Sequence, residues 1–304
     1  MLKQVTITTL AENTAPGPGV LAEHGLSMLV DTGREKILFD TGGEHTLLPN
    51  AGKLKVNLAE VDKVVLSHGH FDHTGGLLPF LAARGGCPVF AHPGIFARKY
   101  KLAKDRQPEY VGIPWTREEL EQKGAVFHLS EGPVEVAPGV ILTGQVKRYQ
   151  PDEAGDHSFY EQSPGGSFHK DYLFDDLALV VRLEAGLLVL LGCAHSGLIN
   201  TLRHVLEITG EAQIYALMGG THLKEASPEQ VEETLDHLAA FGLQKIGVSH
   251  CTGFAASAAL ARRYGSRFFL NNAGTVTKIG GYYSEKFAEN QGIPANTQGG
   301  KVKI

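Results

Sequence analysis

Apolar residues recur along the chain in short runs of strand length, and most of these runs end at a glycine or a polar loop. Residues 186–191 and 214–218 are almost entirely apolar, as expected for strands buried on both faces. The same pattern predicts further strands at residues 1–10, 24–30, 36–40, 61–66, 88–91, several short ones within 125–146, 177–183, 245–248, 267–270 and 275–279.

Helical periodicity separates several of these strands. Residues 196–208 place five apolar side chains on one face. Residues 227–241 begin with Ser-Pro-Glu-Gln, which combines an N-cap, a proline at the first helical position and a capping box. Thr116 and Glu119 have the same capping-box form ahead of another predicted helix. Alternating strands and helices predict a mixed α/β fold.

Residues 147–176 interrupt this alternation with a polar, glycine-containing stretch that carries several aromatic residues and shows little periodicity. A segment of this length inside a compact domain is either a functional lid or a disordered surface insertion. If it is a lid, Arg148, His157 and His169 could reach a substrate. No long linker divides the chain, so we expect residues 1–304 to form one domain with this insertion.

Composition narrows the class of protein. The chain has 304 residues, 42% hydrophobic and 20% charged, and a net charge of −5, which argues against nucleic acid or an anionic membrane as partner. The first residues lack the apolar core of a signal peptide, and no run has the length of a membrane span. The three scattered cysteines fit a reducing cytoplasm. We expect a cytoplasmic protein that acts on a small molecule, with its oligomeric state left open.

The most informative motif is a loop that directly follows an apolar strand, with the sequence Ser-His-Gly-His-Phe-Asp-His at residues 67–73. His68 and His70 alternate and can face one way, whereas Asp72 and His73 follow on a turn and can face a second centre. Imidazole and carboxylate donors suit zinc, and equally iron or manganese. Four donors on one such loop favour two adjacent ions over a histidine-rich surface loop.

Three more predicted strands end in a loop with a histidine, namely His195, His222 and His250. Open α/β sheets place their ligands at the carboxyl ends of strands, so these side chains could converge with residues 67–73. We interpret His195 and His250 as metal ligands, the alternative being packed or capping histidines. His222 is a ligand, a contact to a ligand or substrate, or a plain loop residue. Cys193 is a small strand-end residue near the metals, or a thiolate ligand.

The motif His-x-His-x-Asp-His at residues 68–73 resembles the signature of the metallo-β-lactamase superfamily, and Leu-Phe-Asp-Thr-Gly at residues 38–42 resembles that superfamily's first motif. The resemblance covers about residues 20–280. Four further motifs resemble a narrower subgroup, the proteins similar to 7,8-dihydropterin-6-methyl-4-(β-D-ribofuranosyl)aminobenzene-5′-phosphate synthase. They lie at residues 22–27, 192–197, 219–222 and 250–253.

This resemblance implies a four-layer αββα sandwich with a dinuclear metal site at one edge of its two sheets. It implies that His68 and His70 bind the first ion and that Asp72 and His73 bind the second. His250 matches the last histidine of the superfamily.

The middle of the site departs from the family pattern. Most members carry a bridging aspartate about where Cys193 stands, and His195 would complete the shell of the first ion. We expect Asp40 to orient a ligand or to hold the loop rather than to bind metal. Glu23 and His24 precede a strand and can point into the mouth of the cleft as substrate contacts.

Two adjacent divalent ions lower the pKa of a bound water toward neutrality, and the hydroxide so formed can attack carbon or phosphorus. Asp72 would act as both ligand and proton acceptor. We therefore expect a metal-dependent hydrolase, with zinc as the first choice of metal and a small anionic ester or phosphoester as substrate. The alternatives are a condensing synthase of the subgroup's kind, a di-iron redox enzyme, and a non-catalytic metal-binding module.

Overall fold

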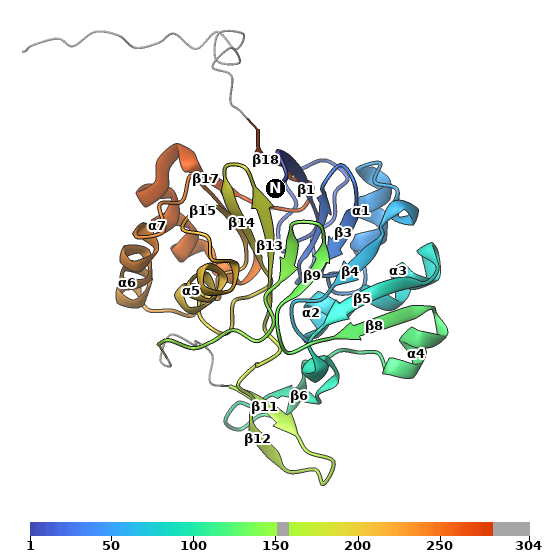
Figure 1. Cartoon of the computed structure of the whole chain (residues 1–304). Coiled ribbons are helices and arrows are strands. Elements are labelled where there is room, and N and C mark those ends of the chain that lie inside the picture. The colour runs from blue at the N-terminus through green and yellow to red at the C-terminus, as the bar shows by residue number, and fades with distance from the viewer. Residues whose placement is uncertain (151–157, 282–304) are drawn as a thin grey trace, which may run out of the picture.

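The computed structural model describes residues 1–150 and 158–281, in which two seven-stranded sheets pack face to face (Figure 1). The first sheet has the order β18-β1-β2-β3-β4-β5-β8. From β3 to β8 its neighbouring strands are parallel, so their carboxyl ends lie at one edge. Its strands are β1 (Gln4–Ala11), β2 (Ser27–Asp31), β3 (Lys36–Phe39), β4 (Lys63–Val65), β5 (Cys87–Ala91), β8 (Ala125–Leu129) and β18 (Val276–Gly280).

The second sheet has the order β17-β16-β15-β14-β13-β10-β9. Strands β14 to β17 are parallel, and His195, His222 and His250 lie in the loops that follow β14, β15 and β16. The members of this sheet are β9 (Val134–Ala137), β10 (Val140–Leu142), β13 (Ala178–Leu183), β14 (Gly186–Leu191), β15 (Ile214–Gly219), β16 (Lys245–Val248) and β17 (Phe268–Leu270).

Helices cover the outer face of each sheet, as Figure 1 shows with α1, α3 and α4 on one side and α5, α6 and α7 on the other. One apolar cluster joins the two sheets, and one further cluster lies between each sheet and its helices. The predicted αββα sandwich is therefore confirmed. The helices are α1 (Leu47–Lys53), α2 (Phe71–Thr74), α3 (Leu77–Arg84), α4 (Arg117–Gln122), α5 (Leu198–Thr209), α6 (Pro228–Ala239) and α7 (Phe254–Tyr264).

A small third sheet of order β12-β11-β6-β7 lies beside the sandwich. Two of its strands come from the described part of residues 147–176, where the sequence pattern predicted no regular structure. They form because β11 pairs with β6, a partner distant in sequence that a local pattern does not reveal. The strands are β6 (Lys99–Lys101), β7 (Glu109–Tyr110), β11 (Phe159–Gln162) and β12 (Phe168–Lys170).

Local signals match most helix starts. The capping boxes predicted at Thr116 and Ser227 are both present. Helix α5 begins at Leu198 rather than at Ser196, because the N–H of Ser196 donates to Asp176 and Gly197 adopts a φ of 97°.

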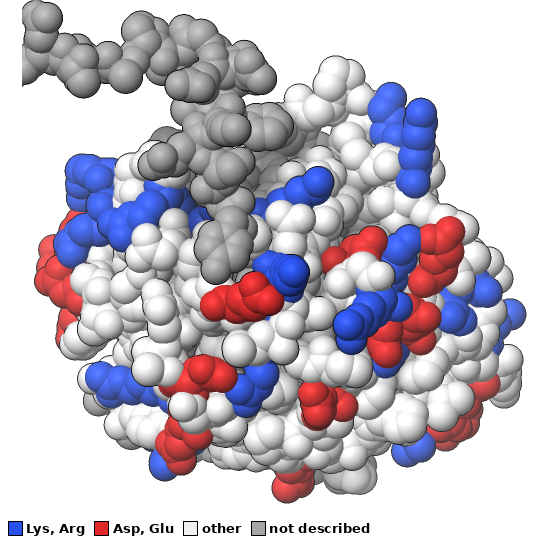
Figure 2. Space-filling view, turned by 45° about the horizontal axis from the view of Figure 1, so that its top comes forward, with Lys and Arg blue, Asp and Glu red and all other residues white. Residues whose placement is uncertain are grey.

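The described residues contain no helix that is long and apolar enough to cross a membrane. On the face seen in Figure 2, Lys and Arg side chains are interspersed with Asp and Glu.

We predict that Leu190→Ala, in β14, lowers the free energy of unfolding by about 2–5 kcal/mol, because it leaves a cavity between the two sheets. Chemical denaturation monitored by circular dichroism measures the change. Val126→Ala on β8 is the control, because Val126 is 56% exposed and its truncation should change stability by about 0.5 kcal/mol or less. Equal effects of the two substitutions would contradict the assignment of the inter-sheet core.

Candidate metal centre

The loops that follow β4, β14, β15 and β16 meet at one edge of the two sheets. Their close approach depends on glycine at two strand ends. A Cβ on Gly192 would lie 2.1 Å from the Oγ of Ser67, and a Cβ on Gly220 would lie 2.4 Å from the carbonyl oxygen of Gly192. Glycine therefore allows these loops, and the side chains they carry, to share one small region.

His68, His70 and His195 form what we call the first donor group, because their ligand nitrogens lie within 4.8 Å of one another. Nε2 of His68 is 3.0 Å from Nδ1 of His70. Burial lowers the pKa of all three imidazoles, that of His70 to about 3. The rings are therefore neutral, which is the form that binds a metal ion.

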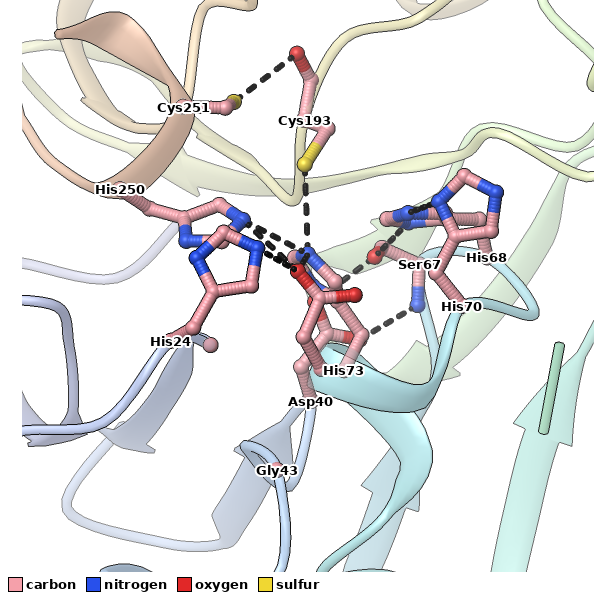
Figure 3. A network of polar contacts seen from close by, with 12 residues as sticks. His24, Asp40, Gly43, Ser67, His68, His70, His73, Cys193, His250 and Cys251 are labelled. Carbon is pink, nitrogen blue, oxygen red and sulfur yellow. Dashed lines mark hydrogen bonds and ion pairs between the residues drawn. The ribbon is translucent and has the colours of Figure 1, made fainter. Parts of the chain in front are cut away.

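Asp72, His73, Cys193 and His250 form the second donor group. Nε2 of His73 lies 3.2 Å from Sγ of Cys193, 3.3 Å from Nε2 of His250 and 3.8 Å from Oδ2 of Asp72. The same Asp72 oxygen is 3.2 Å from Nε2 of His250. His24 extends the group toward solvent, with its Nε2 3.2 Å from Asp72. Figure 3 shows the ring of His73 between His68 and His70 on one side and His250 on the other.

Asp40 ties the second donor group to the backbone at the start of residues 67–73, which we call the metal loop. Its carboxylate accepts hydrogen bonds from the backbone N–H and the hydroxyl of Ser67, each at 2.7 Å, and contacts Nδ1 of His73 at 2.7 Å. This leaves Nε2 of His73 facing the other donors. Burial alone would lower the pKa of His73, but the carboxylates of Asp72 and Asp40 outweigh it and raise the pKa to about 9.

Two polar residues that the sequence pattern did not single out hold His250. Its backbone N–H donates to Oε1 of Glu12 at 2.6 Å, and its Nδ1 lies 2.8 Å from Oδ1 of Asn13. Both residues come at the end of β1, so their one sequence signal is polarity where a buried strand ends. Strained backbone gathers in the same region: Asp40, Ala194, His222 and His250 have positive φ.

Buried nitrogens without partners show that the residues present fit a metal ion. Within the described residues, both ring nitrogens of His195 and Nε2 of His70 are buried and make no hydrogen bond. Leaving such a group unpaired costs about 1–3 kcal/mol, which coordination of a cation would offset. Imidazole, carboxylate and thiolate donors are those of zinc and related transition metals.

Cys251 and His222 lie beside Cys193 of the second donor group. The sulfur of Cys193 points toward His73, whereas the sulfur of Cys251 donates to the carbonyl oxygen of Cys193 at 3.7 Å and accepts from the N–H of His222 at 3.3 Å (Figure 3). The ring of His222 lies 4.2 Å from that of His195. The structure thus brings His222 and Cys193 to the site and adds Cys251, which was not among the predicted site residues.

The predicted substrate contacts lie in different places. The carboxylate of Glu23 accepts hydrogen bonds from the backbone N–H groups of residues 43–46, so it holds the loop that leads to α1. His169 is exposed on β12 with its Nε2 3.4 Å from Glu161, and Arg148 donates to the carbonyl oxygen of Tyr172. His157 lies outside the described residues.

An aromatic residue of the small sheet closes one side of the first donor group. The ring of Phe159, on β11, lies 4.7 Å from that of His70 and 5.4 Å from that of His195. Phe159 is buried together with Val111 and Leu173. The segment 147–176 therefore supplies an apolar wall to the site, a role that the sequence pattern left open between a lid and a surface insertion.

A family model described as the metallo-β-lactamase superfamily matches residues 21–195, more than half of the chain, including the whole first donor group. The chain belongs to the metallo-β-lactamase superfamily.

Two relatives of this superfamily protein cover nearly all of it. The 7,8-dihydropterin-6-methyl-4-(β-D-ribofuranosyl)-aminobenzene-5′-phosphate synthase of Methanocaldococcus jannaschii is 31% identical over 90% of this chain and 97% of its own. The solved structure of Tm1679, described as a metal-dependent hydrolase of the β-lactamase superfamily, is 28% identical over 91% of this chain and 99% of its own, with a TM-score of 0.79. The predicted resemblance to the superfamily and to the synthase-like proteins is therefore confirmed.

A more distant structure shares the fold alone. The metallo-β-lactamase fold protein YhfI from Bacillus subtilis is 13% identical over 90% of this chain and 99% of its own, with a TM-score of 0.53. The superfamily fold and the clustered donors together indicate metal binding.

We predict that Asp40→Asn lowers the pKa of His73 in the metal-free protein by about 1–3 units, because it removes one of the two negative charges that favour the imidazolium. An NMR titration of the ring nitrogens measures it. Asp62→Asn is the control, since this carboxylate accepts the N–H of Lys36 and lies outside the site. An unchanged His73 pKa in Asp40→Asn would contradict the proposed orienting contact.

Proposed function

We propose that this chain is a metal-dependent hydrolase that acts on a small anionic ester or phosphoester. It holds two divalent metal ions, and zinc is the metal that we expect first. The observation that carries the proposal is the pair of adjacent donor groups. His68, His70 and His195 would hold the first ion, and Asp72, His73, Cys193 and His250 the second.

The pairing of neutral and charged donors supports this assignment. The first donor group carries no formal charge, and the second offers a carboxylate and a thiol. Cys193 stands about where a bridging aspartate is usual in the superfamily, and its sulfur is 3.2 Å from His73. We therefore assign Cys193 as a thiolate ligand of the second ion, where a bound cation would lower the pKa of its thiol.

When bound, two such ions supply a nucleophile derived from water and a positive field for the developing oxyanion. Asp72 lies between His24 and His250 and can accept the proton that leaves the nucleophile. His24 is 60% exposed and can pass that proton to solvent or to the leaving group. Phe159 excludes water from the side of the first donor group.

We predict that His195→Ala removes the first ion and at least about 100-fold of the esterase or phosphodiesterase activity, because it deletes a nitrogen that serves only the metal. Elemental analysis of the purified protein and a panel of ester, lactone and phosphodiester substrates measure the two effects. The same analysis identifies the metal, and stoichiometric iron would favour the redox alternative.

His169→Ala is the matched control, since His169 is exposed on β12 and pairs with Glu161. It should keep both ions and full activity. A wild-type protein that holds two ions and leaves the whole panel unchanged would overturn the hydrolase proposal.

A second candidate is a condensing synthase, favoured by the 31% identity with the M. jannaschii enzyme over 97% of that protein. The name of that relative describes a dihydropterin joined through its 6-methyl carbon to a ribofuranosyl-aminobenzene phosphate. In such a reaction the aromatic amine replaces a leaving group on the methyl carbon. The same metal-centred site would then activate the leaving group instead of water.

Mass spectrometry distinguishes the two candidates. If the chain is a synthase, incubation with a 6-hydroxymethyl-dihydropterin diphosphate and 4-(β-D-ribofuranosyl)aminobenzene 5′-phosphate gives the coupled product and free diphosphate. His195→Ala should abolish the coupling. Absence of the coupled product in the metal-loaded wild type, together with turnover of an ester, would exclude the synthase.

A further inference from the structure

The segment between β12 and β13, residues 171–177, runs along the loops that carry the first donor group. Its Leu177 donates a backbone hydrogen bond to the carbonyl oxygen of Ser67 at 2.8 Å. Two consecutive carboxylates of this segment, Asp175 and Asp176, are buried. Each of them reaches a different one of the two loops.

Asp175 holds the loop of His68 and His70. Its Oδ2 accepts the N–H of Gly69, the residue between the two histidines, at 2.8 Å. Its Oδ1 lies 2.9 Å from Nζ of Lys99, a buried lysine on β6. The carboxylate therefore links the backbone between two donors to a fixed positive charge in the small sheet.

Asp176 holds the loop of His195. Its Oδ2 accepts the N–H of Ser196 at 2.8 Å. Its Oδ1 is buried and, within the described residues, accepts no hydrogen bond. A buried carboxylate oxygen without a hydrogen bond is costly, and nearby positive charge offsets that cost. The guanidinium of Arg148 interacts electrostatically with Asp176, and a cation held by the first donor group would add a second positive charge.

The first donor group consists of three imidazoles and contains no carboxylate, so its ligands bring no negative charge to a divalent cation. Carboxylates that contact metal ligands or their loops commonly fix the ligand geometry and favour the cation. Asp175 and Asp176 are buried carboxylates that accept hydrogen bonds from the backbone of these two loops, Asp175 from Gly69 and Asp176 from Ser196. The unpaired oxygen of Asp176 and the uncharged donor group thus complement one another.

We infer that Asp175 and Asp176 are positioning residues for the first metal ion, Asp175 through Gly69 and Asp176 through Ser196. Together they set the distance between the His68–His70 pair and His195, and they supply negative charge to the cation bound there. The inference rests on the proposed metal centre and deepens it.

The test is the affinity of the first ion, measured by zinc competition with a chromophoric chelator at pH 7.5. Asp176→Asn keeps an oxygen that accepts the N–H of Ser196 but removes the negative charge. We expect this variant to bind the first ion about 10–100-fold more weakly, with the affinity for the second ion unchanged. Asp175→Asn tests the contact with Gly69 independently, and it should also lower the affinity for the first ion. The visible spectrum of the cobalt-substituted protein should shift in both.

Asp171→Asn is the matched control, because Asp171 is buried and contacts Lys99 at 2.8 Å, yet touches neither loop. This variant should bind the first and the second ion with unchanged affinity. A second control introduces Asp176→Asn into His195→Ala, which is expected to keep only the second ion. The affinity of that second ion should be unchanged.

Three outcomes would overturn the inference: unchanged affinity for the first ion in both Asp175→Asn and Asp176→Asn, an equal loss in Asp171→Asn, or a loss of affinity for the second ion when Asp176→Asn is added to His195→Ala. Failure of the proposed metal centre looks different, because the wild-type protein itself would then bind no first ion. Thermal unfolding of each variant reports whether a loss of affinity comes from loss of the fold.

Discussion

The carboxylate of Asp40 is the contact on which the geometry of the centre depends. It sits at the end of β3 with a φ of 57°, and it binds the backbone and side chain of Ser67 and the ring of His73 together. Because these contacts are fully buried, none is exchanged for water. One side chain from a neighbouring strand therefore fixes both where the metal loop starts and how its last histidine is turned.

Burial acts in opposite directions on the histidines of the two groups. Around His68, His70 and His195 it removes water without supplying a carboxylate, so the rings stay neutral. His73 is buried as deeply, yet two carboxylates beside it favour its charged form. In the metal-free protein the two donor groups therefore differ in protonation. Binding of an ion to the second donor group must displace the proton of the His73 imidazolium, whereas the first donor group holds no such proton.

The fold and the donors of the centre could largely be predicted from the sequence, because apolar runs and a dense histidine motif are local signals. Residues 147–176 show where that reasoning ends. Strand β11 forms because it pairs with β6, which is distant in sequence. The contact between Phe159 and His70 likewise joins residues that are far apart along the chain. Glu12, Asn13, Asp175 and Asp176 were not predicted as site residues for the same reason: polar side chains near strand ends are common, and their partners lie far away in sequence. Conversely, Glu23 lies in a motif that resembles the family, but its carboxylate accepts hydrogen bonds from the backbone of residues 43–46.

The donors come from both sheets: His68, His70, Asp72 and His73 follow the first, and Cys193, His195 and His250 follow the second. A bound ion of either group is therefore a cross-link between the two halves of the sandwich. Its binding free energy is available only while both sheets keep their relative position, so ligation and the association of the halves are thermodynamically linked. Bound metal at this edge would then also help to hold the two sheets together. Without it, the apolar cluster between the sheets would have to do so alone.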